Sequence, residues 1–521
     1  MKYILNAQQM RCADQGTIRD IGIPSMVLME RAALALAEEA VKVRNGSCAG
    51  KNASYQILAV CGSGNNGGDG FAAARILREK GYPACVLFVG NPARMSEECT
   101  LQSQIYARLG GTTFFLNDPE LNLQQESPCF HEELFSQCSL IIDAVFGIGL
   151  CREVTGTYAE VIRLINSSGA PVIAADIPSG INSDTGAVEG IAVKADVTVT
   201  FEALKYGHLL YPGADHCGKV ITAAIGINVK EKDAGCWPES EDISELLPVR
   251  PVHSNKGTFG KTLLVSGREG MCGAALLAGE AAYRTGTGIV TICSADGNRI
   301  PIQTRLPEAI FLPWSGQEAL RETIRSCSAA AIGPGLGREE TAWKLVQTVF
   351  ASCCSALVAD ADALNLIAQK GFPGHTSPLI ITPHPGEMAR LMHCSIKEVM
   401  DDPPGKAAAF ARENKLICVL KDAVTVITDG ERVWLCHTGC SGMATGGSGD
   451  VLAGMIAGFA AQGMAPFNAA AAGVWIHGSA GTNAARRAGD HGMLASDIIR
   501  ELPDTIRQLY VLDERAGMSE R

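Results

Sequence analysis

Short apolar runs rich in β-branched residues alternate with helical patterns along the whole sequence, and this alternation constrains the fold more than any other feature. In the first half the runs include "YQILAVCG", "ACVLFVG", "SLIIDAVFG" and "APVIAADIPSG", separated by helical patterns such as "DGFAAARILREKG". The second half repeats the alternation from "GKTLLVSG" to "SPLIITPHPGE". Strands that alternate with helices predict α/β layers around largely parallel sheets.

The chain of 521 residues is too long for one ordinary hydrophobic core, so two domains are expected. The stretch "NVKEKDAGCWPESEDISELLPVRP" is polar, contains prolines and has no strand pattern. We therefore predict a first domain over residues 1–237 and a second over residues 238–521.

Charge and composition exclude several classes of partner. A net charge of −11 argues against binding to nucleic acid or to an anionic membrane, because both require basic patches. No apolar stretch is long enough to span a bilayer, and the first residues do not read as a secretory signal. The nineteen cysteines include no C-x-x-C pair and lie mostly in apolar contexts, so we expect a cytoplasmic protein with reduced, buried thiols.

A first glycine-rich loop resembles a dinucleotide-binding fingerprint but departs from it. Gly62, Gly64 and Gly67 follow a strand and precede a helix in the G-x-G-x-x-G spacing. The next strand, "ACVLFVGN", does not end in the acidic residue that holds the ribose of NAD. Asn65 and Asp69 also place polar side chains where a pyrophosphate requires bare backbone. These departures argue against an ordinary dehydrogenase.

Polar residues follow other strands of the same predicted sheet, namely Asp143, Asp176, Ser179 and Lys205. Ligands of open α/β sheets gather at the carboxyl ends of strands, so these groups are expected to converge with the first loop. Carboxylate, amide and hydroxyl oxygens suit a hard cation or proton transfer. A single aspartate of this kind could instead cap a turn, but several at strand ends favour a site.

A second glycine-rich loop lies at the start of the stretch "GMATGGSGDVLAGMIAGFAAQG", residues 442–463. Gly446, Gly447 and Gly449 allow the backbone to approach an anion, and the helix behind them offers unpaired N–H groups. Asp450 stands directly after this loop, where it can take the proton of an acceptor hydroxyl while the loop holds the phosphate. Its alternative role is that of a first-turn acid that complements the helix dipole.

The first half resembles the epimerase domain of the NAD(P)H-hydrate repair enzymes in "GSGNNGGDG", "DAVFGIGLCREVTG", "DIPSGINSDTG" and "TFEALKYGHLLYPG". The resemblance covers most of residues 10–228 and implies a Rossmann-like three-layer αβα fold. It implies a potassium ion held by Asn66, Asp143 and Ser179, and Asp176 as a catalytic residue. The residues implied to contact the hydrated nicotinamide nucleotide are Asn65, Asn66, Gly67, Gly68, Asp69, Gly147, Ile148, Gly149, Leu150, Cys151, Arg152, Glu153 and Asp176.

The second half, over residues 250–510, resembles the ribokinase-like dehydratase domain of the same family in "GPGLG", "DADALN", "ITPHPGEMARLM" and "LKDAVTVITDG". The resemblance implies that Asp450 is the base. It places the hydrated cofactor on Ala274, Gly335, Gly337, His384, Pro385, Gly386, Glu387, Met388, Ala389, Arg390 and Asp450. It places the nucleotide on Lys421, Asp422, Ala423, Val424, Thr425, Cys440, Ser441, Gly442, Met443, Ala444, Thr445, Gly446, Gly447, Ser448 and Gly449. Asp422 departs from the usual glycine.

The implied function is repair of hydrated NADH and NADPH, with epimerisation of the R and S hydrates in the first domain. The second domain would dehydrate the S hydrate with ADP and Mg²⁺, giving AMP and phosphate, although ATP stays open as the donor. Either Asp176 or Asp69 could move the proton in epimerisation. The resemblance to this family also implies that the protein forms a homo-oligomer. The alternative is a ribokinase-type kinase for a vitamin precursor or sugar, with a nucleotide-sensing first domain.

Overall fold

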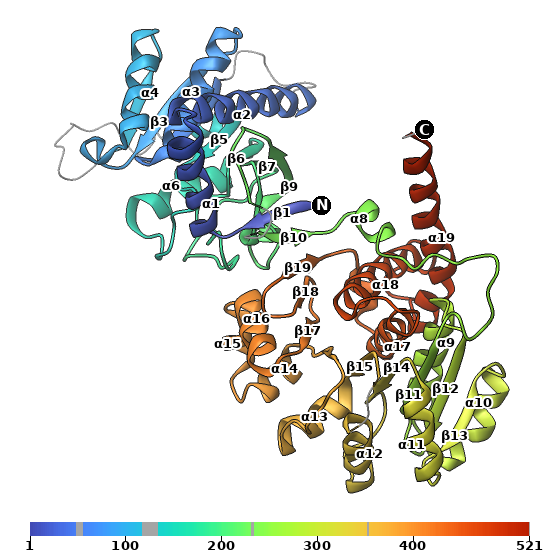
Figure 1. Ribbon diagram of the computed structural model, residues 1–521. Helices are drawn as coiled ribbons and strands as arrows, with labels where there is room; N and C mark the ends of the chain where they lie inside the picture. Colours follow the sequence, from blue (N-terminus) through green and yellow to red (C-terminus); the bar gives the residue numbers. More distant parts are fainter. Residues whose placement is uncertain (48–55, 117–133, 231–233, 352–353, 520–521) are drawn as a thin grey trace. The chain divides into compact units, whose positions relative to one another are not determined.

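The structure is a computed structural model that describes residues 1–47, 56–116, 134–230, 234–351 and 354–519. These residues group into two compact units, Lys2–Ala234 and Gly235–Arg521 (Figure 1). The division lies close to the predicted boundary at residues 237 and 238. We call the two parts the first unit and the second unit and describe each separately.

The first unit is built on a seven-stranded sheet in the order β4-β3-β2-β5-β6-β7-β9. Every neighbouring pair in this sheet is parallel, as the alternation of strands and helices predicts. The strands are β2 (Gln56–Cys61), β3 (Ala84–Val89), β4 (Thr113–Leu116), β5 (Cys138–Ala144), β6 (Val172–Ala175), β7 (Val197–Phe201) and β9 (Lys219–Ala223). A separate parallel pair joins β1 (Lys2–Leu5) to β8 (Leu204–Lys205).

Helices cover both faces of this sheet. Alternate residues of β2 face opposite sides, so that Ile57 and Ala59 join one hydrophobic cluster while Leu58 and Val60 join another. The first cluster includes residues of α2 (Ser25–Ser47), α3 (Asn65–Glu79) and α4 (Glu97–Arg108), and the second includes residues of α6 (Gly156–Ser167). The three-layer αβα arrangement expected for this unit is confirmed. Two further helices are α1 (Ala7–Gly16) and α7 (Ala214–Cys217).

The sheet of the second unit follows the order β13-β12-β11-β14-β15-β16-β17-β18-β19-β10. Its strands are β10 (Gly235–Trp237), β11 (Lys261–Val265), β12 (Ile289–Ser294), β13 (Ile310–Pro313), β14 (Ala329–Ile332), β15 (Ala356–Ala359), β16 (Leu379–Ile381), β17 (Ile417–Leu420), β18 (Thr425–Thr428) and β19 (Val433–Cys436). Pairing is parallel from β13 to β17, but β17, β18 and β19 pair antiparallel. The antiparallel part arises because a short turn at Asp429 and Gly430 joins β18 directly to β19, with no crossover helix.

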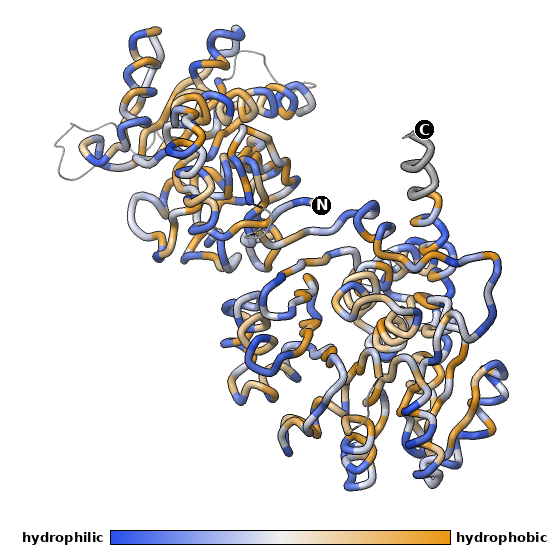
Figure 2. The backbone as a smooth tube through the Cα atoms, in the orientation of Figure 1, coloured by the Kyte–Doolittle hydropathy of each residue, from blue (hydrophilic) through white to orange (hydrophobic). Residues whose placement is uncertain are grey.

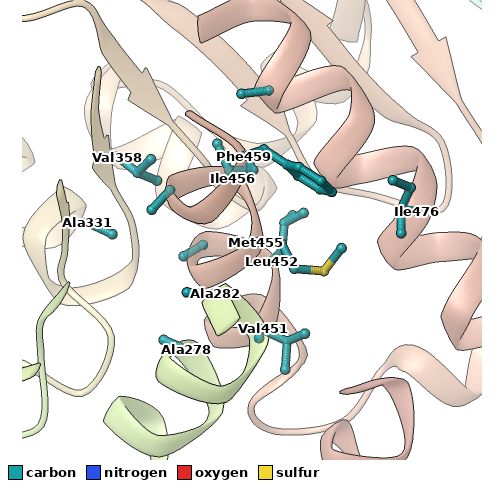
Figure 3. Packing of buried hydrophobic residues seen from close by; sticks show 14 of the residues in the cluster. Ala278, Ala282, Ala331, Val358, Val451, Leu452, Met455, Ile456, Phe459 and Ile476 are labelled. Carbon is teal, nitrogen blue, oxygen red and sulfur yellow. The ribbon is translucent and has the colours of Figure 1, made fainter. Parts of the chain in front are cut away.

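Helix α17 (Ser448–Ala461) lies in the hydrophobic core of the second unit, where Val451, Met455 and Phe459 are almost fully buried (Figure 3). It packs against α9 (Cys272–Arg284) through two glycines. A Cβ added at Gly454 would lie 2.1 Å from the carbonyl oxygen of Ala278, and one at Gly458 would lie 2.3 Å from the Thr285 hydroxyl. The two helices therefore touch backbone to backbone, and this contact fixes the position of the start of α17.

The remaining helices complete the layers of the second unit. They are α8 (Ser240–Ser244), α10 (Arg299–Arg305), α11 (Gln317–Ser326), α12 (Glu340–Phe350), α13 (Ala361–Lys370), α14 (Pro385–Leu391), α15 (Ile396–Met400), α16 (Pro403–Asn414), α18 (Pro466–Ala488) and α19 (Ala495–Ser519). Hydrophobic residues are concentrated in the strands and on the inner sides of helices, while hydrophilic residues lie in outer turns and loops (Figure 2). Among the described residues, no helix is long and apolar enough to cross a membrane.

Candidate functional site

A cavity of about 740 Å³ opens in the first unit at the carboxyl ends of β2, β5 and β6. A volume of this size is typical of sites for small molecules and cofactors. Several predicted contact residues line it, namely Asn65, Asn66, Asp69, Gly147, Ile148, Gly149, Leu150, Cys151, Arg152 and Asp176. Gly67, Gly68 and Glu153 are not among the lining residues.

Asp176 is held at the cavity by a buried lysine. The Lys205 ammonium donates to Asp176 Oδ1 at 2.5 Å, to the Thr200 hydroxyl at 2.9 Å and to the Phe201 carbonyl at 3.1 Å, so all three of its donors are used. Burial acts to raise the pKa of Asp176, but the Lys205 charge and the hydrogen bonds from Lys205 and the Phe201 N–H together hold that pKa below its usual value. Asp176 is therefore an oriented carboxylate. Its backbone has φ +63°, a strained conformation of the kind found at functional sites.

His208 completes this arrangement from behind. Its Nδ1 accepts from the Lys205 backbone N–H at 3.0 Å, and its Nε2 lies 2.8 Å from the Asp176 carbonyl, to which it donates. Burial lowers the pKa of His208 to about 4, so the ring is neutral near pH 7. The neutral ring supports the ion pair without competing with its charge.

Asp69 lies in the second turn of α3 and lines the same cavity, with 8% of its surface exposed. Burial raises the pKa of its carboxyl well above the usual value, and the charges of Asp176 and Asp14 raise it further. Asp69 and Asp176 therefore line one cavity in contrasting electrostatic surroundings.

Asn66, Asp143 and Ser179 are brought together around the loop after β5. The Ser179 hydroxyl donates to Asp143 Oδ1 at 2.6 Å and accepts from the Phe146 N–H at 2.8 Å, while Asn66 Nδ2 donates to the Phe146 carbonyl at 2.9 Å. Burial raises the pKa of Asp143 to about 6, although hydrogen bonds from Ser179 oppose the rise. Each of the three side chains carries an oxygen atom, the type of ligand that a hard cation prefers.

The glycines of the first loop serve close packing of the backbone. A Cβ added at Gly62 would lie 2.1 Å from the Val145 carbonyl oxygen, and one at Gly67 would lie 1.9 Å from the Gly62 carbonyl oxygen. This contact explains why the dehydrogenase-like spacing occurs here without the ribose-binding acid.

In the second unit, Asp450 lies in the first turn of α17, directly after the glycine loop. Gly447 has φ +94°, and a Cβ there would lie 2.5 Å from Leu277, so the loop requires glycine at that position. Burial and the nearby charge of Asp360 raise the pKa of Asp450 to about 7, although Lys421 opposes them. A carboxyl with a pKa near 7 is suited to general base catalysis.

An ion pair lies beside this loop. Lys421 Nζ donates to Asp360 Oδ1 at 2.8 Å, and Asp360 also accepts from the Thr382 hydroxyl at 2.7 Å. A Cβ added at Gly449 would lie 3.4 Å from Lys421 Nζ, so the lysine borders the loop directly. His437 Nδ1 lies 2.6 Å from the Ala423 carbonyl oxygen, which links the segment that precedes the glycine loop to residues 421–425.

The segments predicted to hold the hydrated cofactor also have defined positions. His384 caps α14 by accepting from the Gly386 N–H at 3.0 Å, and Arg390 Nε donates to Asn365 Oδ1 at 2.8 Å. A Cβ added at Gly335 would lie 3.0 Å from the Cβ of Ala274, so these two predicted residues are neighbours.

The structure adds residues that we did not predict as part of either site. Arg11 and Asp14 of α1 and Glu98 of α4 line the cavity of the first unit, and Asp360 lies beside the second glycine loop. Only Asp360 had a signal in the sequence, because it opens the "DADALN" motif. The residues on α1 and α4 had no such signal, because the sequence does not show which helices lie beside the carboxyl ends of the strands.

Comparison with known proteins matches each unit to a family model of its own and the whole chain to bifunctional enzymes. The family described as NAD(P)H-hydrate dehydratase matches residues 262–504, and the family described as YjeF-related protein N-terminus matches residues 25–207. The bifunctional NAD(P)H-hydrate repair enzyme of Moorella thermoacetica is 37% identical over 530 residues, covering 97% of this chain and 97% of that protein. The enzymes with this description from Vibrio cholerae and Escherichia coli are each 34% identical, over 97% and 85% of this chain and 98% and 84% of theirs.

Solved structures resemble about half of the chain. A Streptococcus mutans protein is 29% identical with a TM-score of 0.50, covering 53% of this chain and all of its own. The ADP/ATP-dependent NAD(P)H-hydrate dehydratase of Bacillus subtilis, co-crystallised with ATP and Mg²⁺, is 33% identical with a TM-score of 0.49 and covers 52% of this chain and 98% of its own. With matches along almost its whole length, this chain belongs to the family of bifunctional NAD(P)H-hydrate repair enzymes.

Proposed function

We propose that each unit performs one of the two reactions for which this family is named. The first unit interconverts the R and S hydrates of NADH and NADPH, and the second unit dehydrates the S hydrate at the expense of ADP. The observation that carries the proposal is the half-buried Asp450 placed directly behind a glycine loop at a helix N-terminus. Together the two reactions recover both epimers, whereas dehydration alone would leave the R hydrate behind.

Dehydration in the second unit proceeds through phosphorylation. Asp450 takes the proton of the hydroxyl on the ring carbon next to the nicotinamide nitrogen, and the oxygen attacks the terminal phosphorus of ADP, releasing AMP. The nitrogen lone pair then expels phosphate, and loss of a proton from the adjacent ring carbon restores NAD(P)H. The N–H groups of the glycine loop and the Lys421 ammonium stabilise the charge on the transferred phosphoryl group.

The contact residues are proposed to be those that the family resemblance implies. Residues 421–425 and 440–449 hold the nucleotide, and residues 384–390 hold the hydrated cofactor with Ala274, Gly335 and Gly337. In the first unit the hydrate occupies the cavity of about 740 Å³ that Asp69 and Asp176 line. Support comes from the convergence of these segments at strand ends.

Two cations fit the residues present. Asn66, Asp143 and Ser179 would hold a potassium ion, because their donor atoms are all oxygens and Asn66 Oδ1 is left as an acceptor when Nδ2 bonds Phe146. Mg²⁺ would accompany the nucleotide and neutralise its phosphate oxygens. We further propose a homo-oligomer that acts in the cytoplasm, in line with free buried thiols such as those of Cys61, Cys85 and Cys293.

The alternative kinase function is less well supported, because the relatives that match almost the whole chain are described as repair enzymes. The test incubates purified protein with mixed NADH hydrates and ADP or ATP, and follows the absorbance of the reduced nicotinamide. Recovery of both epimers, with dehydration lost in Asp450→Asn, would support repair and identify the donor. Turnover of ATP on a vitamin-like alcohol, with no recovery of either hydrate, would favour the kinase.

A further inference from the structure

The cavity of the first unit contains two carboxyl groups whose surroundings differ sharply. Asp176 accepts hydrogen bonds from Lys205, Thr200 and the Phe201 N–H. Asp69, although only 8% exposed, accepts no hydrogen bond from any other side chain or backbone group in the described part of the chain. Asp69 reaches solvent only through the cavity, and in such a largely desolvated place a carboxylate without a donor is costlier than a protonated carboxyl. Pairs of carboxyls held in opposite states are a common basis for acid–base catalysis.

The groups that face Asp69 reinforce this difference. They are Asp176 at the end of β6, Asp14 on α1, Cys61 on β2 and Cys99 on α4. Each of these is neutral or negative. Arg11, Arg152 and Glu98 also line the cavity, but among the described residues neither arginine forms an ion pair or hydrogen bond with Asp69. Asp69 therefore stays a carboxylic acid under conditions in which Asp176 is a carboxylate.

We propose that Asp69 is the general acid of the epimerase, and that Asp176, fixed by Lys205, is the carboxylate that pairs with the cationic ring formed in the reaction. Lys205 is a positioning residue, because it acts only through Asp176. The inference rests on the epimerase activity proposed above and assigns the chemistry within it.

The reaction that this arrangement supports is reversible loss of the ring hydroxyl. Asp69 gives its proton to the hydroxyl oxygen, the carbon–oxygen bond breaks and water leaves. The lone pair of the ring nitrogen forms a double bond to the same carbon, and the positive ring is stabilised by the Asp176 carboxylate. Water then adds to either face of the carbon, the electron pair returns to nitrogen, and Asp69 recovers its proton. No oxidant, reductant or other reactant is needed.

The first test measures epimerisation without ADP, so that the second unit cannot dehydrate the S hydrate. The R hydrate that remains after the S hydrate has been consumed serves as substrate, and the appearance of S hydrate is followed by chromatography. We expect Asp69→Asn to lower the kcat of epimerisation by ~10²-fold or more, with KM changed by only a few-fold, as for loss of a general acid. Addition of ADP and S hydrate then reports dehydration by the second unit of the same sample, which should be unchanged.

A pH profile separates proton donation from a structural role. Epimerisation by the wild-type protein should decline as pH rises through the pKa of Asp69, because only the protonated form is active. Asp14→Asn is the matched variant: it removes one negative charge that faces Asp69, so the decline should move to lower pH. An unshifted decline in Asp14→Asn, or epimerisation by Asp69→Asn within about threefold of wild type, overturns the assignment.

Isotopic labelling tests the bond that breaks. In water enriched in ¹⁸O, loss and return of the hydroxyl places solvent oxygen in every inverted hydrate. Opening of the ring at nitrogen would invert the carbon while keeping its original oxygen, so inverted hydrate without label also overturns the proposal. If the wild-type protein recovers only the S hydrate, the epimerase function itself is refuted, and this assignment with it.

Discussion

The contact between α17 and α9 should control dehydratase activity, because Asp450 stands at the start of α17. We take Gly454→Ala as the perturbation. The added Cβ would lie 2.1 Å from the Ala278 carbonyl oxygen, whereas real Cβ atoms are essentially never closer than 3.0 Å to such an atom. The helices must therefore separate by about 0.9 Å, since both partners are backbone or fixed to it. A displacement of about 1 Å at a catalytic group can lower the rate ~10²-fold.

Stability should change less than activity. Overpacking costs about 1–3 kcal/mol, and replacing a helical glycine by alanine returns about 0.5–1 kcal/mol. We therefore expect the free energy of unfolding of the second unit to fall by about 0–2.5 kcal/mol, while the kcat of dehydration falls ~10²-fold.

The assay compares dehydration of S hydrate, epimerisation of R hydrate and urea unfolding in the same preparation. Gly374→Ala is the matched control, because a Cβ at Gly374 meets nothing within 4 Å and its φ is not positive. This control should change neither activity, and Gly454→Ala should spare epimerisation. Dehydration by Gly454→Ala within about twofold of wild type would refute the reasoning, since it would mean that the helix contact does not position Asp450.

The other predictions concern protonation. The dehydratase rate should rise with pH through about 7, because Asp450 acts as a carboxylate, and the rise should be lost with most of the activity in Asp450→Asn. Asp360→Asn should move that rise to lower pH, because the Asp360 charge raises the pKa of Asp450; a rise at unchanged pH would contradict the electrostatic account. His208 and His477 have pKa values lowered to about 4 by burial, from 6.5. The unfolded chain binds their protons first as pH falls, so the free energy of unfolding should decrease from pH 6.5 towards pH 4 by about 3 kcal/mol for each histidine. Urea unfolding across this range would test the effect, and an unchanged free energy would exclude it.

The sequence predicted the α/β layers and the residues at strand ends because both depend on local patterns. Buried strands read as apolar runs. Asp143 lies near the end of such a run in β5, Asp176 follows β6 directly, and Asn65 follows β2 after a short loop. The antiparallel pairing of β17, β18 and β19 was not predicted, although the Asp429–Gly430 turn between two short apolar runs was visible. We had expected parallel strands because strands alternate with helices elsewhere in the sequence. In this segment a short turn joins β18 to β19, and such a turn makes the two strands antiparallel.

Groups contributed by distant segments could not be predicted from local patterns. Asp360 lies 2.8 Å from Lys421 although 61 residues separate them, because β15 and β17 each pair with β16 and so end near one another. Asp14 reaches the cavity from α1, whose position depends on tertiary packing. The contrast between Asp69 and Asp176 likewise comes from burial and from Lys205, neither of which has a sequence signature of its own.

The tight backbone packing of Gly62 and Gly67 bears on how sequences are sorted into functional classes. These glycines match a fingerprint used to recognise NAD-dependent dehydrogenases, yet their lack of side chains is required by contacts of the protein with itself. A motif search would therefore assign a redox role to this loop, and a mutational scan would find both positions intolerant and appear to agree. To distinguish cofactor binding from internal packing, one must know which atom an added Cβ would meet at each glycine. At Gly62 and Gly67 that atom is a carbonyl oxygen of the protein's own chain.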